Sequence, residues 1–394
     1  MFLHRSARIR HRRTVGAHGP CRGRAGGRRA ARRRRIPGAP TLRRRPGARL
    51  CRRRDHAAPV GRCAVASRRN PGHQGDLAQP CPCHAGGCVS NPLIIDTDVA
   101  LGAWHEGRPR DIDDGFAIIE AMNLDAFNLI GITTVFGNAP LSDTTRIANE
   151  LVKLKGVSVP VVAGAAEPLP RRGDLVAPND AVRFLAKALE HRTLKIAAIG
   201  PLTNIGLLAA HYPEQMANIE ELVIVAGRSP GRNFYLGDAG PVRDFNFESD
   251  VRAARLVLEA GVPTVLAGFE LTSQVVITER DLTTIAARGT PTADYLHRNS
   301  IDWVRYWIRE FPVDSGFHPW DSAALAWLLQ PDLFVAEPRG WQIRGSEEDN
   351  DPFDDGVPRL ECDAEFSGAP VTYLSGFQPG AKSAFVRGVV GNVY

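Results

Sequence analysis

The sequence of 394 residues predicts an α/β protein with a doubly wound, mostly parallel sheet and helices on both faces. From residue 91 onward, short apolar segments rich in β-branched residues alternate with longer amphipathic segments, which is the first observation behind this class. The second is that no apolar run approaches the length of a membrane-spanning helix, so no membrane association is expected. The third is that Cys362 is the only cysteine after residue 90, which excludes a disulfide-stapled scaffold and indicates the cytoplasm.

Each expected element follows from its hydrophobic period. Buried strands are expected at residues 93–95, 129–135, 159–162, 194–199, 222–225 and 264–266. Helices are expected at 114–123, 141–154, 181–190, 202–210, 250–260, 293–309 and 321–329. The aromatic residues of 293–309 are expected to pack in the core or in a lid, and Asp321 is a good N-cap for the last helix. Beyond residue 330 the pattern weakens, and the acidic run 347–355 is expected to be a solvated surface loop.

Residues 1–90 differ sharply from the rest of the chain. They hold 23 arginines, no lysine and two acidic residues, so their formal charge is +21 and the remaining 304 residues carry −15. Because they have no periodic apolar pattern, they are expected to be a disordered basic segment, with residues 91–394 forming one α/β domain.

Several interpretations of this segment stay open: a basic arm for nucleic acid, an organelle transit peptide, or a metal knuckle at Cys81, Cys83, His84 and Cys88. The preferred interpretation is translation of a GC-rich gene from upstream of its true start, with Val89 suited to an alternative initiation codon. Aromatic residues that would stack on bases are not interleaved with the arginines, so no nucleic-acid partner is expected.

Five aspartates lie within residues 96–114, at the end of the first predicted strand and the start of the next helix. They are Asp96, Asp98, Asp111, Asp113 and Asp114. Such a group repels itself unless a cation lies among its members. Oxygen ligands of this kind suit a hard divalent cation, so the sequence predicts a metal site where polar residues follow the strands.

Five motifs in this order resemble those of the calcium-dependent nucleoside hydrolases, the inosine–uridine family and its purine-preferring relatives. They are Asp96-Thr-Asp98 with Asp113-Asp114, the segment 132–138 ending in Gly-Asn138, Gly200-Pro-Leu-Thr-Asn204, Asp244-Phe-Asn246, and Trp320-Asp321. The resemblance covers about residues 92–335. It implies a nucleoside-hydrolase-like fold and hydrolysis of the N-glycosidic bond of ribonucleosides to ribose and free base, by a homo-oligomer that is a dimer or tetramer.

The resemblance also implies a role for each matching residue. Asp98 would be both Ca²⁺ ligand and the general base for a Ca²⁺-bound water, while Asp114, Asp321 and the carbonyl of Ile199 would complete the cation's protein ligands. The side chain of Asp96 would orient neighbouring groups.

The remaining matches would hold the sugar. Asp113 would accept a ribose hydroxyl, and Asn138, Asn233, Asp244 and Asn246 would anchor the rest of the ribose. For Asn246, capping of the helix near residue 250 is the alternative. Thr203 and Asn204 are instead expected to close a helix N-terminus.

The chain departs from the family pattern in three places. The acidic clusters are separated by residues 99–110, which are interpreted either as a lid or base-contacting element or as a harmless surface insertion, and Asp244 stands where many relatives have Glu. Trp320 occupies the place of a histidine that is thought to protonate the leaving base in the inosine–uridine branch. The purine-preferring branch has Trp there, so stacking on a purine and purine preference are expected, with His318 and His105 as candidate acids.

Two other functions are compatible with parts of the sequence. A strand that ends in Asp-x-Asp also opens the Mg²⁺-dependent phosphohydrolases that resemble haloacid dehalogenases, although their later Lys and second acidic pair have no match here. Nucleic-acid binding through the arginine-rich segment is the alternative from another class.

Overall fold

A nine-stranded sheet organises the residues that the computed structural model describes, which are 91–232, 242–345 and 357–394. Its strand order is β12-β11-β13-β8-β7-β6-β1-β4-β5. The strands are β1 (Asn91–Thr97), β4 (Phe127–Thr134), β5 (Val161–Ala163), β6 (Leu194–Ala198), β7 (Ile219–Ile224), β8 (Thr264–Ala267), β11 (Phe334–Arg344), β12 (Arg359–Asp363) and β13 (Val371–Phe377). The predictions for residues 1–90, for Asn233 and for 347–355 lie outside these residues.

The sheet is doubly wound, as predicted. From β1 the chain passes to β4 and β5 on one side, then returns to β6 on the other side and continues through β7 and β8, all in parallel pairing. The six predicted strands are therefore confirmed, with ends that shift by a few residues. The order of the strands reverses at β1, so the loops after β1 and β6 separate there and leave space for a ligand.

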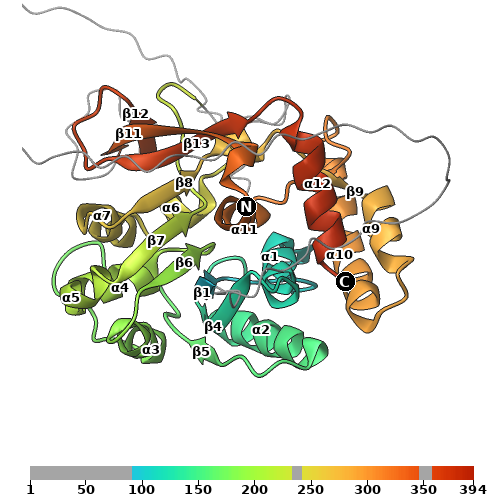
Figure 1. Cartoon of the computed structure of the whole chain (residues 1–394), viewed down its shortest axis with the longest axis horizontal. Helices are drawn as coiled ribbons and strands as arrows, with labels where there is room; N and C mark the ends of the chain where they lie inside the picture. Colours follow the sequence, from blue (N-terminus) through green and yellow to red (C-terminus); the bar gives the residue numbers. More distant parts are fainter. Residues whose placement is uncertain (1–90, 233–241, 346–356) are drawn as a thin grey trace, which may run out of the picture. The chain divides into compact units, whose positions relative to one another are not determined.

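Helices cover both faces of the sheet (Figure 1). They are α1 (Asp113–Asn123), α2 (Leu141–Lys155), α3 (Asp180–Leu189), α4 (Thr203–His211), α5 (Pro213–Met216), α6 (Phe245–Ser249), α7 (Val251–Glu259), α8 (Phe269–Thr272), α9 (Glu279–Ala286), α10 (Pro291–Glu310), α11 (Ser322–Leu329) and α12 (Ala381–Asn392). A 3₁₀ turn, η1, spans Pro331–Leu333. Among the described residues, no helix is both long and apolar enough to cross a bilayer.

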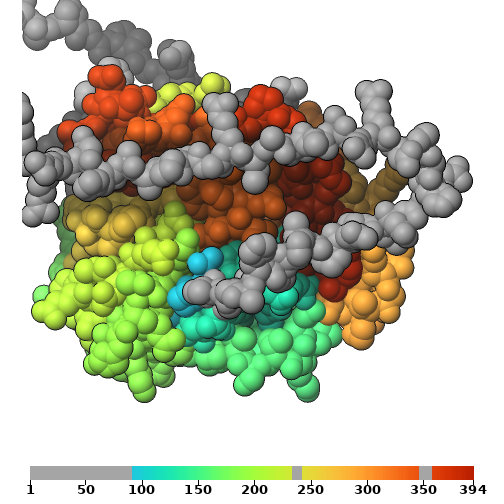
Figure 2. Space-filling model, viewed as in Figure 1, coloured from blue at the N-terminus to red at the C-terminus, as the bar shows by residue number. Residues whose placement is uncertain are grey.

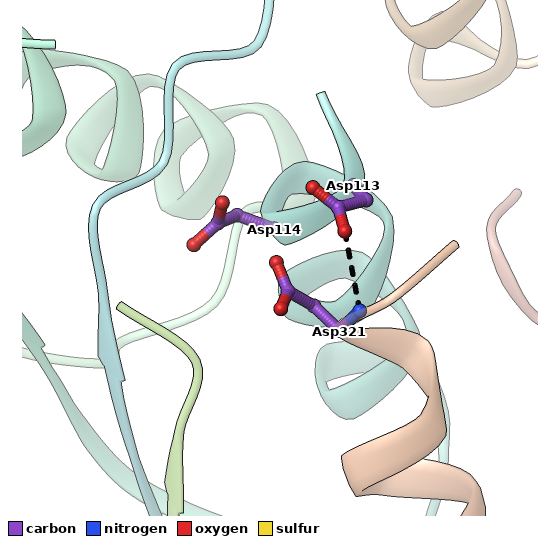
Figure 3. A group of neighbouring side chains, drawn as sticks. All are labelled: Asp113, Asp114 and Asp321. Atoms are coloured by element: carbon purple, nitrogen blue, oxygen red, sulfur yellow. Dashed lines mark hydrogen bonds between the residues drawn. The ribbon is translucent and has the colours of Figure 1, made fainter. Parts of the chain in front are cut away.

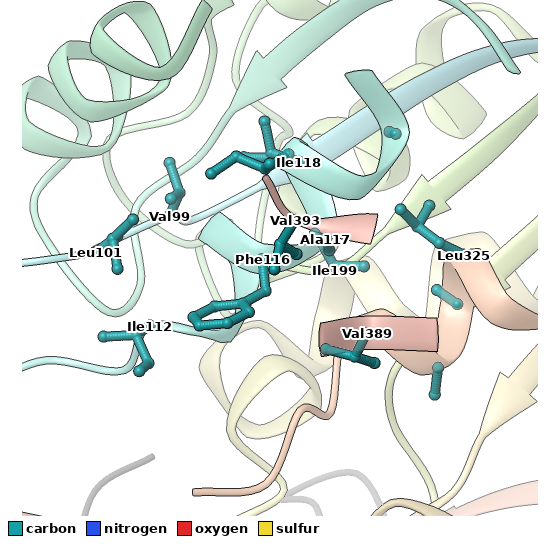
Figure 4. Packing of buried hydrophobic residues seen from close by; sticks show 14 of the residues in the cluster. Val99, Leu101, Ile112, Phe116, Ala117, Ile118, Ile199, Leu325, Val389 and Val393 are labelled. Carbon is teal, nitrogen blue, oxygen red and sulfur yellow. The ribbon is translucent and has the colours of Figure 1, made fainter. Parts of the chain in front are cut away.

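The core has two parts, one on each face, because successive side chains of a strand point to opposite sides. Leu93 and Ile95 of β1 belong to the cluster formed with α1, α2, α10, α11 and α12, whereas Ile94 belongs to the cluster formed with α3, α4 and α7. In the first cluster, Phe116 of α1 and Val389 of α12 lie in the same packed group (Figure 4). The space-filling view shows side chains occupying the gaps between the ribbons (Figure 2).

Two aromatic side chains of α10, Trp303 and Trp307, pack in the core. Of the two expectations for this helix, core packing or a lid, core packing is therefore confirmed. Trp303 is 3% exposed and Trp307 is 2% exposed. The prediction that Asp321 caps α11 is wrong in its detail, because Asp321 stands at the N-cap position but its side chain makes no capping hydrogen bond.

The C-terminal part of the sheet was not predicted. Strand β13 pairs parallel to β8, β11 pairs antiparallel to β13, and β12 pairs antiparallel to β11. The middle of β11 is exposed and carries Glu337 and Pro338, so it lacks the apolar run that marked the other strands.

Residues 99–110 have a buried base and an exposed hairpin, and none of them lines the pocket described below. Leu101 and Ala103 are buried with the α1 core, and a Cβ atom on Gly115 would lie 2.8 Å from the Leu101 side chain. The short hairpin of β2 (Trp104–His105) and β3 (Arg108–Pro109) projects from this base and leaves Trp104 54% exposed. A second hairpin joins β9 (Ile277–Thr278) to β10 (Gly316–Phe317).

Candidate active site and metal centre

The predicted acidic residues meet at the carboxyl ends of the central strands. Asp98 directly follows β1, Ile199 directly follows β6, Asp113 and Asp114 open α1, and Asp321 precedes α11. Segments more than two hundred residues apart along the chain are thus brought to one edge of the sheet. The insertion 99–110 does not displace the second acidic pair.

Three carboxylates form a compact group (Figure 3). One oxygen from each of Asp113, Asp114 and Asp321 lies within 4.8 Å of the others, and all three side chains are buried. The backbone N–H of Asp321 donates to Oδ2 of Asp113 over 3.2 Å, and the hydroxyl of Thr97 donates to Oδ1 of Asp114. The structure therefore adds Asp113, which was predicted to bind the sugar, to the predicted pair Asp114 and Asp321.

Asp98 is not one of the three carboxylates of this group, but it is fully buried and near enough to interact electrostatically with Asp114 and Asp321. Its Oδ2 atom accepts a 2.6 Å hydrogen bond from the backbone N–H of Asn138. Glycine is required on both sides of Asp98, because a Cβ on Gly137 would lie 2.0 Å from Oδ2 and one on Gly200 would lie 2.8 Å from the backbone nitrogen of Asp98. The chain thus closes tightly around Asp98 and holds its orientation.

The electrostatics of the group fit a bound cation. Burial and the nearby Asp114 raise the pKa of Asp98 well above its usual value, and burial together with Asp113 raises the pKa of Asp321. Within the described residues, Oδ1 of Asp98 and Oδ2 of Asp114 are buried without a hydrogen-bond donor. Unsatisfied buried carboxylate oxygens are costly, and a divalent cation with oxygen ligands would satisfy them.

Asp96 takes the orienting position that was predicted for it. Its Oδ1 accepts from the hydroxyl of Thr133 at 2.5 Å and from the amide of Asn204 at 2.8 Å, and its backbone carbonyl accepts from the N–H of Ile199 at 2.8 Å. It thereby fixes the loop after β6 against β1.

Asn204 and Thr203 differ from their prediction. Neither closes the N-terminus of α4: Asn204 binds Asp96 and the carbonyl of Thr134, and Thr203 donates to Asp250 at 2.7 Å. Polar residues at a helix start were interpreted as caps, whereas here Asn204 binds two strands of the sheet and Thr203 binds the N-cap residue of α7.

A pocket adjoins the carboxylate group and contains about 510 Å³ not filled by protein atoms, with the open mouth included. It is lined by eight residues that the sequence singled out, namely Asp111, Asp113, Asn138, Ile199, Asp244, Asn246, Trp320 and Asp321. Asp98 and Asp114 are fully buried and do not line it.

The sugar-binding candidates Asp244 and Asn246 are held by the backbone. Oδ2 of Asp244 accepts from the N–H of Gly227 at 3.0 Å, and burial raises the pKa of Asp244 to about 7. The amide group of Asn246 donates to the carbonyls of Ile199 (2.9 Å) and Val225 (3.3 Å), so it does not cap α7, where Asp250 does so.

An aromatic wall closes one side of the pocket. The rings of Trp320 and Phe269 stack with 5.5 Å between centroids and 18° between planes. His318 packs against Trp320 at 4.6 Å, but its ring nitrogens lie 2.7 Å from the carbonyl of Val275 and 3.2 Å from Asp314. Neither His318 nor His105 is among the lining residues, so their geometry gives no support to an acid role.

Sequence reasoning missed part of the lining, including Arg243, Phe245, Phe269 and Thr272. The search was for polar residues just after strands. Phe269 lies shortly after β8, where a functional residue is expected, but it is apolar. Its position in the sequence could therefore have identified it, whereas its residue type could not.

The buried carboxylates make the stability of the metal-free protein fall as pH rises. Burial raises the pKa of Asp96 and Asp114 from 3.8 to about 7, so the folded state holds protons that the unfolded state releases above pH 3.8. Calcium chloride should raise the melting temperature more at about pH 8 than at about pH 5, because protonated carboxylates bind the ion poorly. Scanning fluorimetry with and without EDTA measures this, and an equal gain at both pH values would contradict it.

A pocket at the switch point of a doubly wound sheet, lined by carboxylates suited to a divalent cation, is typical of metal-dependent α/β enzymes. Comparison with known proteins narrows this class. The model of the inosine–uridine preferring nucleoside hydrolase family matches residues 93–369. The chain therefore belongs to the inosine–uridine preferring nucleoside hydrolase family and is a ribonucleoside hydrolase.

The relatives differ in the specificity that their names state. The chain is 34% identical over 272 residues to the non-specific ribonucleoside hydrolase RihC of Escherichia coli (strain SMS-3-5 / SECEC), covering 63% of this chain and 82% of that protein. It is 30% identical over 275 residues to the pyrimidine-specific ribonucleoside hydrolase RihA of Shewanella woodyi, with the same coverage. The solved purine-preferring ribonucleoside hydrolase of Gardnerella vaginalis shares the fold, with a TM-score of 0.63, 20% identity and coverage of 77% and 99%.

Proposed function

We propose that this hydrolase cleaves purine ribonucleosides preferentially, with a Ca²⁺ ion held by Asp98, Asp114, Asp321 and the carbonyl of Ile199. The observation that carries the metal site is the pair of buried, unsatisfied oxygens on Asp98 and Asp114 next to Asp321. The carbonyl of Ile199 accepts one hydrogen bond from Asn246, and a carbonyl oxygen has a second lone pair for a cation.

The reaction requires negative charge near the sugar, because cleavage of a ribosyl C–N bond passes through a transition state that resembles an oxocarbenium ion. A cation bound here would lower the pKa of a water and orient two ribose hydroxyls. Asp98 is proposed as the general base as well as a cation ligand. Its Oδ1 would bind the cation, and its Oδ2, which accepts one hydrogen bond from the N–H of Asn138 and has a second lone pair, would accept the proton. The surrounding carboxylates stabilise the developing positive charge of the sugar.

The other polar lining residues are proposed to hold the ribose. Asp113 would accept one hydroxyl, while Asn138, Asp244 and Asn246 would bind the rest. Because both amide hydrogens of Asn246 are engaged by carbonyl groups, its Oδ1 is the atom that would accept a sugar hydroxyl. Asp244 is one methylene shorter than the Glu of many relatives, so we expect the sugar to lie closer to the loop that carries it.

The aromatic wall supports the purine preference. Trp320 and Phe269 both line the pocket, and the two-ring face of a purine gains more from stacking on an aromatic side chain than a pyrimidine does. A base stacked on Trp320 would have a higher proton affinity and would be held for protonation by solvent.

We also propose that the enzyme acts in the cytoplasm as a homo-oligomer. The unpaired, buried Cys362 is consistent with a reducing compartment.

Steady-state kinetics with calcium chloride on inosine, guanosine, uridine and cytidine test the proposal. We expect the highest kcat/KM on the purine nucleosides and loss of turnover in EDTA. Higher kcat/KM on uridine would contradict the purine preference. Hydrolysis of p-nitrophenyl phosphate with magnesium, without nucleoside hydrolysis, would instead favour the phosphohydrolase alternative.

A further inference from the structure

A buried tyrosine that lies beyond the residues matched by the family model contacts the wall of the pocket. Tyr373 belongs to β13, is 0% exposed, and follows the end of the match at residue 369. Its hydroxyl donates a hydrogen bond to Oε2 of Glu270, in the short helix α8. Neither residue lines the pocket, so any effect of this contact on the substrate must act through the residues next to it.

The carboxylate of Glu270 joins two loops that do line the pocket. Its Oε1 accepts a 2.7 Å hydrogen bond from the N–H of Ser229, in the loop after β7. The N–H of Phe269 donates over 3.1 Å to the carbonyl of Gly227, which is a second link between the same two loops. Gly227 and Phe269 are both lining residues. One buried tyrosine thus holds the carboxylate that ties the two loops together.

The environment of Tyr373 fixes its hydroxyl at this place. The guanidinium of Arg339 lies 4.5 Å from the centre of its ring, and the same group donates to the hydroxyl of Ser229 over 2.8 Å. A Cβ atom on Gly268 would lie 2.1 Å from the Tyr373 hydroxyl oxygen, so the close approach of β13 to α8 requires glycine there. The contact is therefore held by strands β11 and β13 and by the two segments that follow β7 and β8.

These links end at the residues proposed to hold the substrate. Gly227 donates to Asp244, a proposed sugar ligand, and Phe269 stacks on Trp320, the proposed base platform. We propose that Tyr373 and Glu270 are a positioning pair that sets the distance between the sugar and base walls, so that nucleoside affinity depends on the C-terminal strand β13. This inference rests on the proposed function only in taking this pocket as the nucleoside site.

The test compares Tyr373→Phe with Tyr295→Phe. Tyr295 is a matched control, because its hydroxyl donates to Glu150 over 3.1 Å between α10 and α2, and neither residue lines the pocket. In Tyr373→Phe, we expect KM for both inosine and uridine to rise about tenfold while kcat changes much less, since a loosened wall weakens binding and not the carboxylate group. Calcium affinity, measured by calorimetry with calcium chloride, should stay at the wild-type value, and Tyr295→Phe should leave KM unchanged.

Variants at Glu270 and Gly268 give independent results. Glu270→Ala removes both bonds and should raise KM as Tyr373→Phe does, whereas Glu270→Gln retains an acceptor for Ser229 and a group that can bind the tyrosine hydroxyl, and should stay near the wild-type KM. Gly268→Ala displaces the tyrosine hydroxyl and should raise KM without removing a hydrogen-bonding group.

A wild-type KM in Tyr373→Phe would overturn the inference, as would a loss of calcium affinity in parallel with the rise in KM, which would indicate general destabilisation. Asp244→Asn separates this inference from the proposed function. If Asp244→Asn raises KM and Tyr373→Phe does not, only the positioning pair is wrong. If Asp244→Asn leaves KM unchanged, the pocket is not the nucleoside site and both proposals fail.

Discussion

Asp98→Asn should lower kcat for nucleoside hydrolysis about 10³-fold, because it removes the proposed general base and one cation ligand together. The fold should survive. Asp98 is a buried carboxylate with an unsatisfied oxygen and a carboxylate neighbour, Asp114, so a neutral side chain relieves repulsion in the metal-free protein. Single-turnover and steady-state assays, together with the melting temperature in EDTA, measure both effects.

Asp143→Asn is the matched control for this substitution. Asp143 is a carboxylate of α2 that pairs with His105 at 3.1 Å, outside the pocket lining, and its replacement should leave kcat unchanged. An Asp98→Asn protein that is unfolded would show that Asp98 is needed for the structure, and one that retains turnover would remove it from the chemistry.

Trp320→Ala should lower kcat/KM on inosine by about 10- to 100-fold, the size expected for the loss of one aromatic stacking contact with a base. The loss on p-nitrophenyl riboside should be much smaller, because its leaving group departs without protonation. The ratio of the two losses is the informative quantity, since simple damage to the pocket would affect both substrates.

Trp104→Ala serves as the control, because Trp104 is 54% exposed on the β2–β3 hairpin and does not line the pocket. It should leave both rates unchanged. Equal losses on inosine and on the nitrophenyl riboside in Trp320→Ala would contradict the stacking role and, with it, the main support for purine preference.

The sequence predicted the parallel part of the fold because those strands are buried on both faces. Strands β6 and β8, for example, consist of β-branched or apolar residues at nearly every position, and the amphipathic helices between them fix the parallel pairing. Strands β11 to β13 could not be predicted in the same way. The middle of β11 is exposed, and the pairing of β13 with β8 joins segments about a hundred residues apart.

The part of the site that consists of aspartates could be predicted from the sequence, because carboxylates are typical ligands of divalent cations. Asp114 and Asp321 meet as expected, since the carboxyl ends of parallel strands converge at one edge. The grouping of Asp113 with this pair, the Phe269 wall and the contact of Tyr373 with Glu270 depend on side-chain directions and on the unpredicted C-terminal strands. No local sequence signal specifies such contacts.

The most direct test of the account is a crystal structure of the protein grown with calcium chloride, with the ion located by anomalous scattering. The account predicts one ion bound by carboxylate oxygens of Asp98, Asp114 and Asp321 and by the carbonyl oxygen of Ile199. Crystals saturated with calcium that show no ion at this position, or an ion that Asp98 does not contact, would contradict it.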